Sequence, residues 1–220
     1  MISIRKASDR GHVNFGWLNA KHTFSFGSYF DPAHMGFKSL RVINNDLIAP
    51  AGGFDTHPHK DMEIITFILE GELEHRDTMG NHSIIKPGEI QIMSAGTGVH
   101  HSEHNPSQTN PTKLYQIWVI PNQKGVEPRY EQYNYLDRVV ENEFIDLATP
   151  TGGDRIAKVY QQASIKFGKF KAEYTNQIEI DNSKGYWLQI ISGKLEINGQ
   201  EVEKRSEEHT SESSHRTISY

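Results

Sequence analysis

Short apolar segments, each separated from the next by polar residues, recur along most of the chain. Segments such as SLRVIN (39–44) and KLYQIWVIP (113–121) have the length of strands and are rich in β-branched and aromatic residues. Their alternation fits strands better than any helical period. Turn signals such as SGK (192–194) separate them. The pattern predicts an all-β protein, and the best helix candidate is a short turn near 128–136.

Two hairpin-like segments suggest a repeated unit. FILEGELEHRDTMGN (67–81) and QIISGKLEINGQ (189–200) share an apolar strand, a Gly, an alternating strand and a turn. This favours two β-barrels in tandem, although β-hairpins in general share such a pattern. A stretch rich in Pro, Gly, Asn and charge separates the halves. We expect a first barrel in 1–122, a linker in 123–145 and a second barrel in 146–204.

The last sixteen residues, 205–220, have a different character. They read RSEEHTSESSHRTISY and contain no apolar run of strand length. The first eight match the one-frame translation of a sequencing-library adapter, and the next three match its following codons after a single-base slip. We predict that 205–220 is a non-native tail that adds no closing strand, which leaves the second barrel truncated. The alternative is a natural polar tail.

Composition narrows the function classes. A formal charge of −5 without a basic stripe argues against direct nucleic-acid binding. The chain has no Cys, which excludes disulfides, thiolate metal sites and cysteine nucleophiles. No apolar stretch follows the N-terminal MISIRKASDRGH, and no run approaches the length of a membrane span. We therefore expect a cytoplasmic protein without a membrane partner.

Five of the twelve His fall in two tight groups, THPHKDME (56–63) and GVHHSEHN (98–105). Side chains alternate between the two faces of a strand, so His57 and His59 share a face. By the same parity His101 and Glu103 share a face. If both segments line one barrel interior, three imidazoles and one carboxylate converge there.

Such a donor set predicts one divalent transition metal. Three neutral nitrogens and one hard oxygen suit Fe(II), which we expect, or Mn(II), Ni(II), Co(II) or Cu(II). Four ligands leave two octahedral positions open for substrate and oxygen. Glu63 shares parity with His57, and could be a further ligand, a carboxylate that supports the ligands, or a solvated residue beyond a bulge.

The same residues carry a family resemblance. His57-x-His59-x3-Glu63 followed by Gly71 resembles the first cupin motif, and Pro87-Gly88 with Gly98-x2-His101-x3-Asn105 resembles the second. Gly71 comes one residue late, and Ala51 stands where the motif usually has an upstream Gly. HTFSFGSYFDP (22–32), THPHKDMEI (56–64) and IMSAGTGVHHSEHN (92–105) are similar to the bacterial pirins, which are often described as quercetin 2,3-dioxygenases.

The resemblance implies a bicupin whose first barrel holds the metal through His57, His59, His101 and Glu103, while the second barrel has lost its site. It also implies a dioxygenase that cleaves the central ring of flavonols such as quercetin and releases CO, with Glu103 as catalytic base. The first alternative is a metal-dependent redox-sensing module that binds a regulatory or metabolic partner protein. A cupin isomerase or sugar-binding cupin is a third reading.

Several aromatic residues could line the approach to this site. His22, Phe24, Phe26, Tyr29 and Phe30 form an N-terminal aromatic stretch that either covers the barrel mouth or packs in the core. Met93 and Trp118 lie in expected strands, and either line the cavity or belong to the core. Aromatic flanks favour a flat, flavonol-like substrate.

Overall fold

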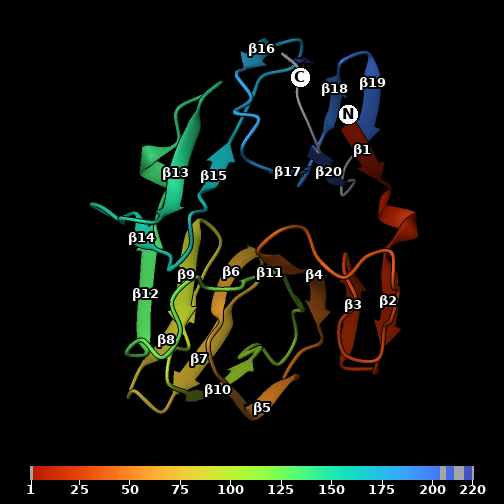
Figure 1. The fold of residues 1–220 in the computed structure, drawn as a ribbon. Helices are drawn as coiled ribbons and strands as arrows, with labels where there is room; N and C mark the ends of the chain where they lie inside the picture. The colour runs from red at the N-terminus through yellow and green to blue at the C-terminus, as the bar shows by residue number, and fades with distance from the viewer. Residues whose placement is uncertain (1, 204–206, 211–215, 220) are drawn as a thin grey trace. The chain divides into compact units, whose positions relative to one another are not determined.

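The computed structural model describes residues 2–203, 207–210 and 216–219, most of which lie in β-strands (Figure 1). The chain divides into two compact units. The larger unit comprises 11–139 and 145–167, and the smaller unit comprises 1–10, 140–144 and 168–220. The all-β prediction is confirmed. Because the two units interleave along the chain, the contiguous boundaries expected from the sequence stay a prediction.

Two antiparallel sheets make up most of the larger unit. The seven-stranded sheet has the order β12 (Arg129–Asn134), β9 (Glu89–Ser94), β6 (Glu63–Glu70), β11 (Thr112–Val119), β4 (Leu40–Ile48), β3 (Leu18–His22) and β2 (Gly11–Asn14). The four-stranded sheet has the order β5 (Gly53–His59), β10 (Val99–His104), β7 (Leu73–Asp77) and β8 (His82–Ile85). In Figure 1, β4, β6 and β11 lie on the opposite side of the unit from β5 and β10.

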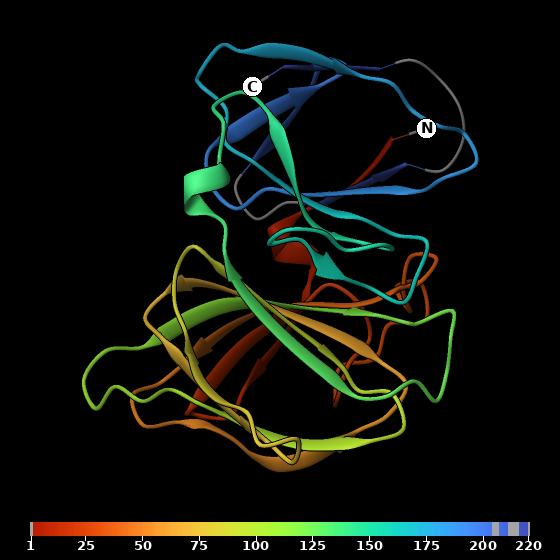
Figure 2. The same cartoon turned by 90° about the vertical axis from the view of Figure 1, so that its left-hand side faces the viewer.

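Apolar side chains from both sheets meet between them, as alternation along each strand requires. One cluster joins the seven-stranded sheet to the four-stranded one through Leu18, Ala20, Ile48, Ile68, Leu114, Leu73 and Ile85, all buried. Figure 2 shows the unit from a second side. Across the described residues, the barrel expected from the sequence is therefore built as two facing sheets.

The helix candidate near 128–136 is wrong. Arg129–Asn134 forms β12, which pairs with β9 along its whole length. The segment RYEQYN mixes charged, amide and aromatic residues without an apolar face, which suits a strand at the edge of a sheet. In the part of the chain that the structure describes, helical segments are the 3-10 turns η1 (Ala7–Asp9) and η2 (Leu136–Arg138), and no helix there is long and apolar enough to cross a membrane.

The smaller unit is also β-structured. Its sheets have the orders β1 (Ile2–Arg5), β20 (Glu207–Thr210), β17 (Tyr186–Gln189) and β16 (Thr175–Ile178), β21 (Arg216–Ser219), β18 (Lys194–Ile197), β19 (Gln200–Glu203). A further sheet, of the order β14 (Ala157–Lys158), β13 (Phe144–Thr149), β15 (Ile165–Gly168), lies mostly in the segment 145–167 of the larger unit. The core of the smaller unit is formed by Ile190, Leu195, Ile197 and Val202.

The last residues depart from expectation. β20 pairs with β1 and β17, and β21 pairs with β16 and β18. The prediction that 205–220 adds no strand is therefore wrong for these two segments, because ladder pairing uses backbone groups that nearly every sequence supplies. Residues 204–206, 211–215 and 220 lie outside the described residues, and the non-native origin of the tail stays a prediction.

Glu63, the open candidate of the first His group, supports the fold. Its side chain is buried, and its Oε2 accepts hydrogen bonds from Ser94 Oγ (2.9 Å) and from the backbone N–H of Tyr160 (3.2 Å). The contact fastens 145–167 to β6 and β9. Burial raises the pKa of Glu63, while these hydrogen bonds and the charge of Arg129 oppose the rise.

We expect Glu63→Gln to stabilise the protein more at pH 8 than at pH 4. Because the folded-state pKa is raised, the folded protein binds this proton more tightly than the unfolded chain. The stability contributed by the carboxyl group is therefore present at low pH and lost as the pH rises through the folded pKa. A glutamine oxygen keeps both acceptor contacts without this loss. Urea unfolding of both proteins at the two pH values measures the difference.

Glu72→Gln, in an exposed turn, is the matched control for removal of a carboxylate. A Glu63→Gln effect on the free energy of unfolding that is equal at both pH values would contradict the coupling between Glu63 protonation and stability.

Candidate metal centre

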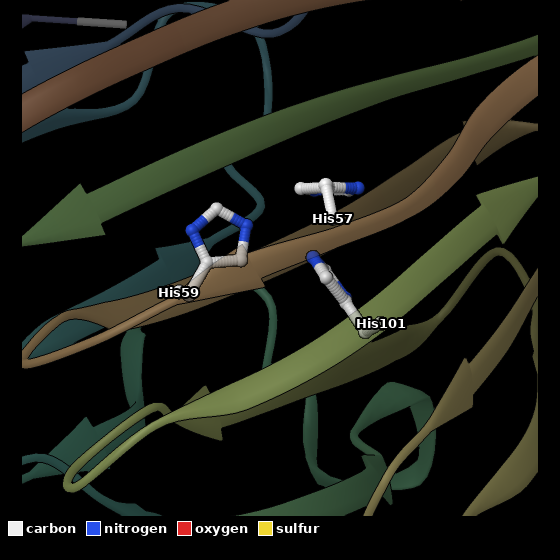
Figure 3. Close-up of side chains that lie close together, drawn as sticks. All are labelled: His57, His59 and His101. Atoms are coloured by element: carbon white, nitrogen blue, oxygen red, sulfur yellow. The ribbon is translucent and has the colours of Figure 1, made fainter.

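Three imidazoles meet where β5 and β10 pair. The register sets His101 opposite His57 and Val99 opposite His59. The ring centroids lie 4.5 Å apart for His57 and His101, and 4.8 Å apart for His57–His59 and for His59–His101. Figure 3 shows the three rings converging from the two strands. One possible ligand atom from each ring lies within 4.8 Å of those of the others, which confirms the convergence expected from strand parity.

Glu103 shares the inner face of β10 with His101 by alternation, and the strand opposite, β5, carries a bulge at this point. On β5, the two residues between Phe54 and His57 oppose the single Ser102 of β10, so that Glu103 pairs with Phe54. Such a bulge re-aims side chains locally. Glu103 is 2 % exposed and forms a second group of potential ligands with His101 and His75. The four predicted ligands thus lie in two overlapping groups that share His101.

The protonation of the imidazoles suits them to bind a metal. His57 Nδ1 donates to the backbone oxygen of Asp55 at 2.7 Å, which leaves Nε2 as the nitrogen with a free lone pair. Burial, with the neighbouring His57, lowers the pKa of His59 to about 4. Burial and the other imidazoles lower the pKa of His101 to about 2. Both rings are therefore neutral near pH 7, the form that ligates metals.

Two atoms aimed into the site lack a hydrogen-bond partner within the described residues. They are His101 Nε2 and Glu103 Oε1, both buried. The other carboxylate oxygen, Glu103 Oε2, accepts a hydrogen bond from Gln116 Nε2 at 2.9 Å. Burial raises the pKa of Glu103 to about 7, although the Gln116 hydrogen bond lowers it. Leaving such atoms without a partner is costly, which indicates that the site is built for a ligand.

Sequence reasoning missed three buried or nearly buried residues that interact with the candidate ligands: His75, Gln116 and Asp46. His75, on β7, is fully buried, and its Nδ1 lies 3.4 Å from His101 Nδ1; burial lowers its pKa, against the opposing effect of Asp77. Gln116 orients Glu103, as described above. Asp46 is buried with its pKa raised to about 7, first by burial and then by the charge of Glu103. Only His75 gave a signal, since it alternates in step with Leu73 and Asp77.

The aromatic residues divide between core and site. Phe24 and Met93 are buried, and Met93 packs with Ile64, which supports the core reading for both. The Trp118 ring meets His59 edge-on at 4.9 Å and Phe26 at 5.1 Å. Trp118 Nε1 donates to Gln116 Oε1 at 3.1 Å. Trp118 and Phe26 therefore form an aromatic wall beside His59.

The rest of the N-terminal aromatic stretch lies apart from that wall or behind it. Phe30 is 71 % exposed. His22 is buried, with its Nδ1 2.7 Å from Asn44 Oδ1, and its ring stacks with Tyr29 at 6.3 Å. Of this stretch, Phe26 is the residue that lies beside Trp118, and a role in covering the barrel mouth stays a prediction.

Comparisons with known proteins agree on a family. The Pirin model matches residues 3–119, and a model described as the quercetinase C-terminal cupin domain matches 147–218. The second match includes most of the segment that we expected to be non-native. Together the two matches confirm the bicupin expected from the sequence.

Individual relatives are similar along most of their length. The chain is 47 % identical over 199 residues to the quercetin 2,3-dioxygenase of Escherichia coli K12, covering 90 % of this chain and 85 % of that protein. It is 45 % identical over 202 residues to a putative quercetin 2,3-dioxygenase of Pasteurella multocida, covering 90 % and 85 %.

Among solved structures, the bacterial pirin YhhW of Escherichia coli in complex with nickel(II) superposes with a TM-score of 0.94 at 42 % identity, covering 100 % of this chain and 93 % of that one. A match to more than half of the chain, a relative of this identity and a shared fold over the full length lead to one conclusion: the chain belongs to the pirin family.

Proposed function

We propose that the protein is a metal-dependent dioxygenase that cleaves the central ring of flavonols such as quercetin with O2 and releases CO. The observation that carries the proposal is a pair of buried atoms without a hydrogen-bond partner among the described residues, His101 Nε2 and Glu103 Oε1, in a centre where His101 also meets His57 and His59. The names of the Escherichia coli and Pasteurella multocida relatives support the substrate class.

The residues present fit a divalent transition metal. His57, His59 and His101 offer neutral nitrogens, and Glu103 offers one oxygen that no described group occupies. We propose these four as the ligands and Fe(II) as the metal. The nickel(II) complex of the Escherichia coli pirin supports Ni(II) as a second candidate, and the same donors accept Mn(II), Co(II) or Cu(II). When bound, the metal would supply Lewis-acid activation of the flavonol and of dioxygen.

The protein's own groups would prepare the substrate. Glu103 would serve as both ligand and base: Oε1 is a weakly held ligand atom that can detach and take the proton of the flavonol 3-hydroxyl, while Gln116 holds Oε2. In the metal-free protein, burial raises the pKa of Glu103 to about 7, which makes it a stronger base than an exposed carboxylate. The aromatic wall of Trp118 and Phe26 offers a flat substrate an apolar surface next to His59.

The deciding experiment is anaerobic reconstitution with Fe(II), Mn(II), Ni(II), Co(II) or Cu(II), followed by exposure to quercetin and O2. Loss of flavonol absorbance with CO release, absent in His101→Ala, is the expected result. Stoichiometric metal binding without turnover for every metal would contradict the dioxygenase. It would favour the redox-sensing module with a protein partner.

We expect Glu103→Gln to lose more turnover than metal affinity. Glutamine keeps an oxygen at the ligand position but cannot act as a base at neutral pH, so kcat should fall by about 10²- to 10⁴-fold. Calorimetric titration with Ni(II) and the rate of quercetin consumption measure the two effects. Equal losses in both would show that Glu103 serves only as a ligand.

We expect Phe26→Leu to raise the KM for quercetin by about 3- to 10-fold, the scale of one aromatic contact, with a smaller change in kcat. Steady-state kinetics checks this. Phe30→Leu, in the same segment but 71 % exposed, is the matched control. An equal effect of the two changes would argue against the aromatic wall as a substrate surface.

A further inference from the structure

We propose that a buried hydrogen-bond chain from Asp77 through His75 to His101 holds the proton of His101 on Nδ1 and so keeps Nε2 free for the metal. The inference rests on the metal centre proposed above, and makes His75 and Asp77 positioning residues of that centre. It does not depend on which reaction the centre performs.

The first two residues of this hydrogen-bond chain, Asp77 and His75, lie on β7, the strand next to the ligand strand β10. β7 pairs with β10 in the register His101–Asp77 and Glu103–His75. Alternation turns Leu73, His75 and Asp77 to the same inner face. The side chains of His75 and Asp77 are both 0 % exposed, so their hydrogen bonds face no competition from solvent.

Asp77 sets the direction in which the hydrogen bonds of this chain are donated. Its Oδ1 accepts from the backbone N–H groups of Met79 (2.9 Å) and Asn81 (3.0 Å). Its Oδ2 accepts from Asn81 Nδ2 (2.8 Å) and lies 3.0 Å from His75 Nε2. Because backbone and amide N–H groups can only donate, Asp77 is fixed as an acceptor. The proton of His75 is therefore on Nε2.

The position of the His75 proton determines which nitrogen of His101 is protonated. A neutral imidazole carries a single proton, so His75 Nδ1 has a lone pair. It lies 3.4 Å from His101 Nδ1, and two lone pairs would repel at that separation. His101 therefore carries its proton on Nδ1 and donates it to His75. The remaining nitrogen, His101 Nε2, is the buried atom for which the described part of the chain supplies no hydrogen-bond partner.

His75 is held as a link in the chain rather than as a ligand. Both of its nitrogens are engaged, one with Asp77 and one with His101. The ring of Tyr130 packs on it with centroids 4.7 Å apart and an interplanar angle of 31°. The Tyr130 hydroxyl donates to Gln132 at 2.8 Å, which fixes the tyrosine in turn. Groups behind metal-bound histidines commonly fix tautomer and ring orientation in this way.

The test is Asp77→Asn, which replaces one acceptor with a donor and keeps the shape. The Asn oxygen would still accept the two backbone N–H groups, so its NH2 group would face His75 Nε2 and the side chain of Asn81, which can turn its amide oxygen toward that group. His75 would then hold its proton on Nδ1 and donate to His101 Nδ1, which moves the His101 proton to Nε2. Long-range ¹H–¹⁵N spectra of the metal-free proteins should show His101 as the Nδ1–H tautomer in wild type and the Nε2–H tautomer in the variant.

Calorimetric titration with Ni(II) gives the second readout. The affinity of Asp77→Asn should fall by about 10- to 100-fold, the usual cost of losing a group that orients a ligand. Asp31→Asn changes a second carboxylate–histidine pair, Asp31 with His34, and should leave the Ni(II) affinity unchanged. His75→Gln can accept from His101 and donate to Asp77, so its affinity should stay within about 3-fold of wild type, well inside that cost.

Each failure has a distinct meaning. The proposed hydrogen-bond chain would be contradicted by an Nε2–H tautomer of His101 in the wild-type protein. It would also be contradicted by an Asp77→Asn variant that binds Ni(II) as tightly as wild type does. A large loss of affinity in His75→Gln would show that His75 is itself a ligand and overturn it as well. A folded wild-type protein that binds no Ni(II) would contradict the metal centre proposed above instead.

Discussion

The antiparallel pairing of β5 with β10 is the constraint on which the candidate centre depends. Neither strand carries enough donors alone, and the register of the pair sets His101 opposite His57. The facing sheet then completes the site, since Gln116 and Trp118 come from β11. The apolar cluster between the two sheets keeps them at the distance where these side chains meet. The positions of the four candidate ligands are therefore set by the paired strands of the two sheets.

Three of the four candidate ligands are each supported by a different group. The backbone oxygen of Asp55 holds His57, the amide of Gln116 holds Glu103, and His75 lies behind His101. These supports use fixed dipoles or neutral rings, which are cheaper to bury than further charges. Asp77 is the exception, and it is compensated by the N–H groups of its own turn. The interior thus tolerates several polar groups because most of them are paired.

Sequence reasoning predicted the parts of the molecule that follow from local periodicity. Parity along two strands was enough to bring His57, His59 and His101 together, because side-chain direction alternates on any strand. It could not reveal Gln116, and the alternation of His75 with Leu73 and Asp77 did not show that His75 meets His101, because both residues reach the site through strand pairings distant in sequence. β12 was missed because an edge strand lacks a clear apolar face. The strands in 207–210 and 216–219 were missed for a similar reason, since backbone pairing there does not require an apolar run.

The bulge in β5 makes the length of this strand as important as the identity of its ligands. Phe54 and His57 are three residues apart, yet both face the interior, because the extra residue between them restores the parity. Deleting either Asp55 or Thr56 would leave every donor in the sequence but force the strand to expose Phe54 or to turn His57 and His59 outward. A search for related centres in other chains should therefore weigh insertions and deletions in this segment as heavily as substitutions.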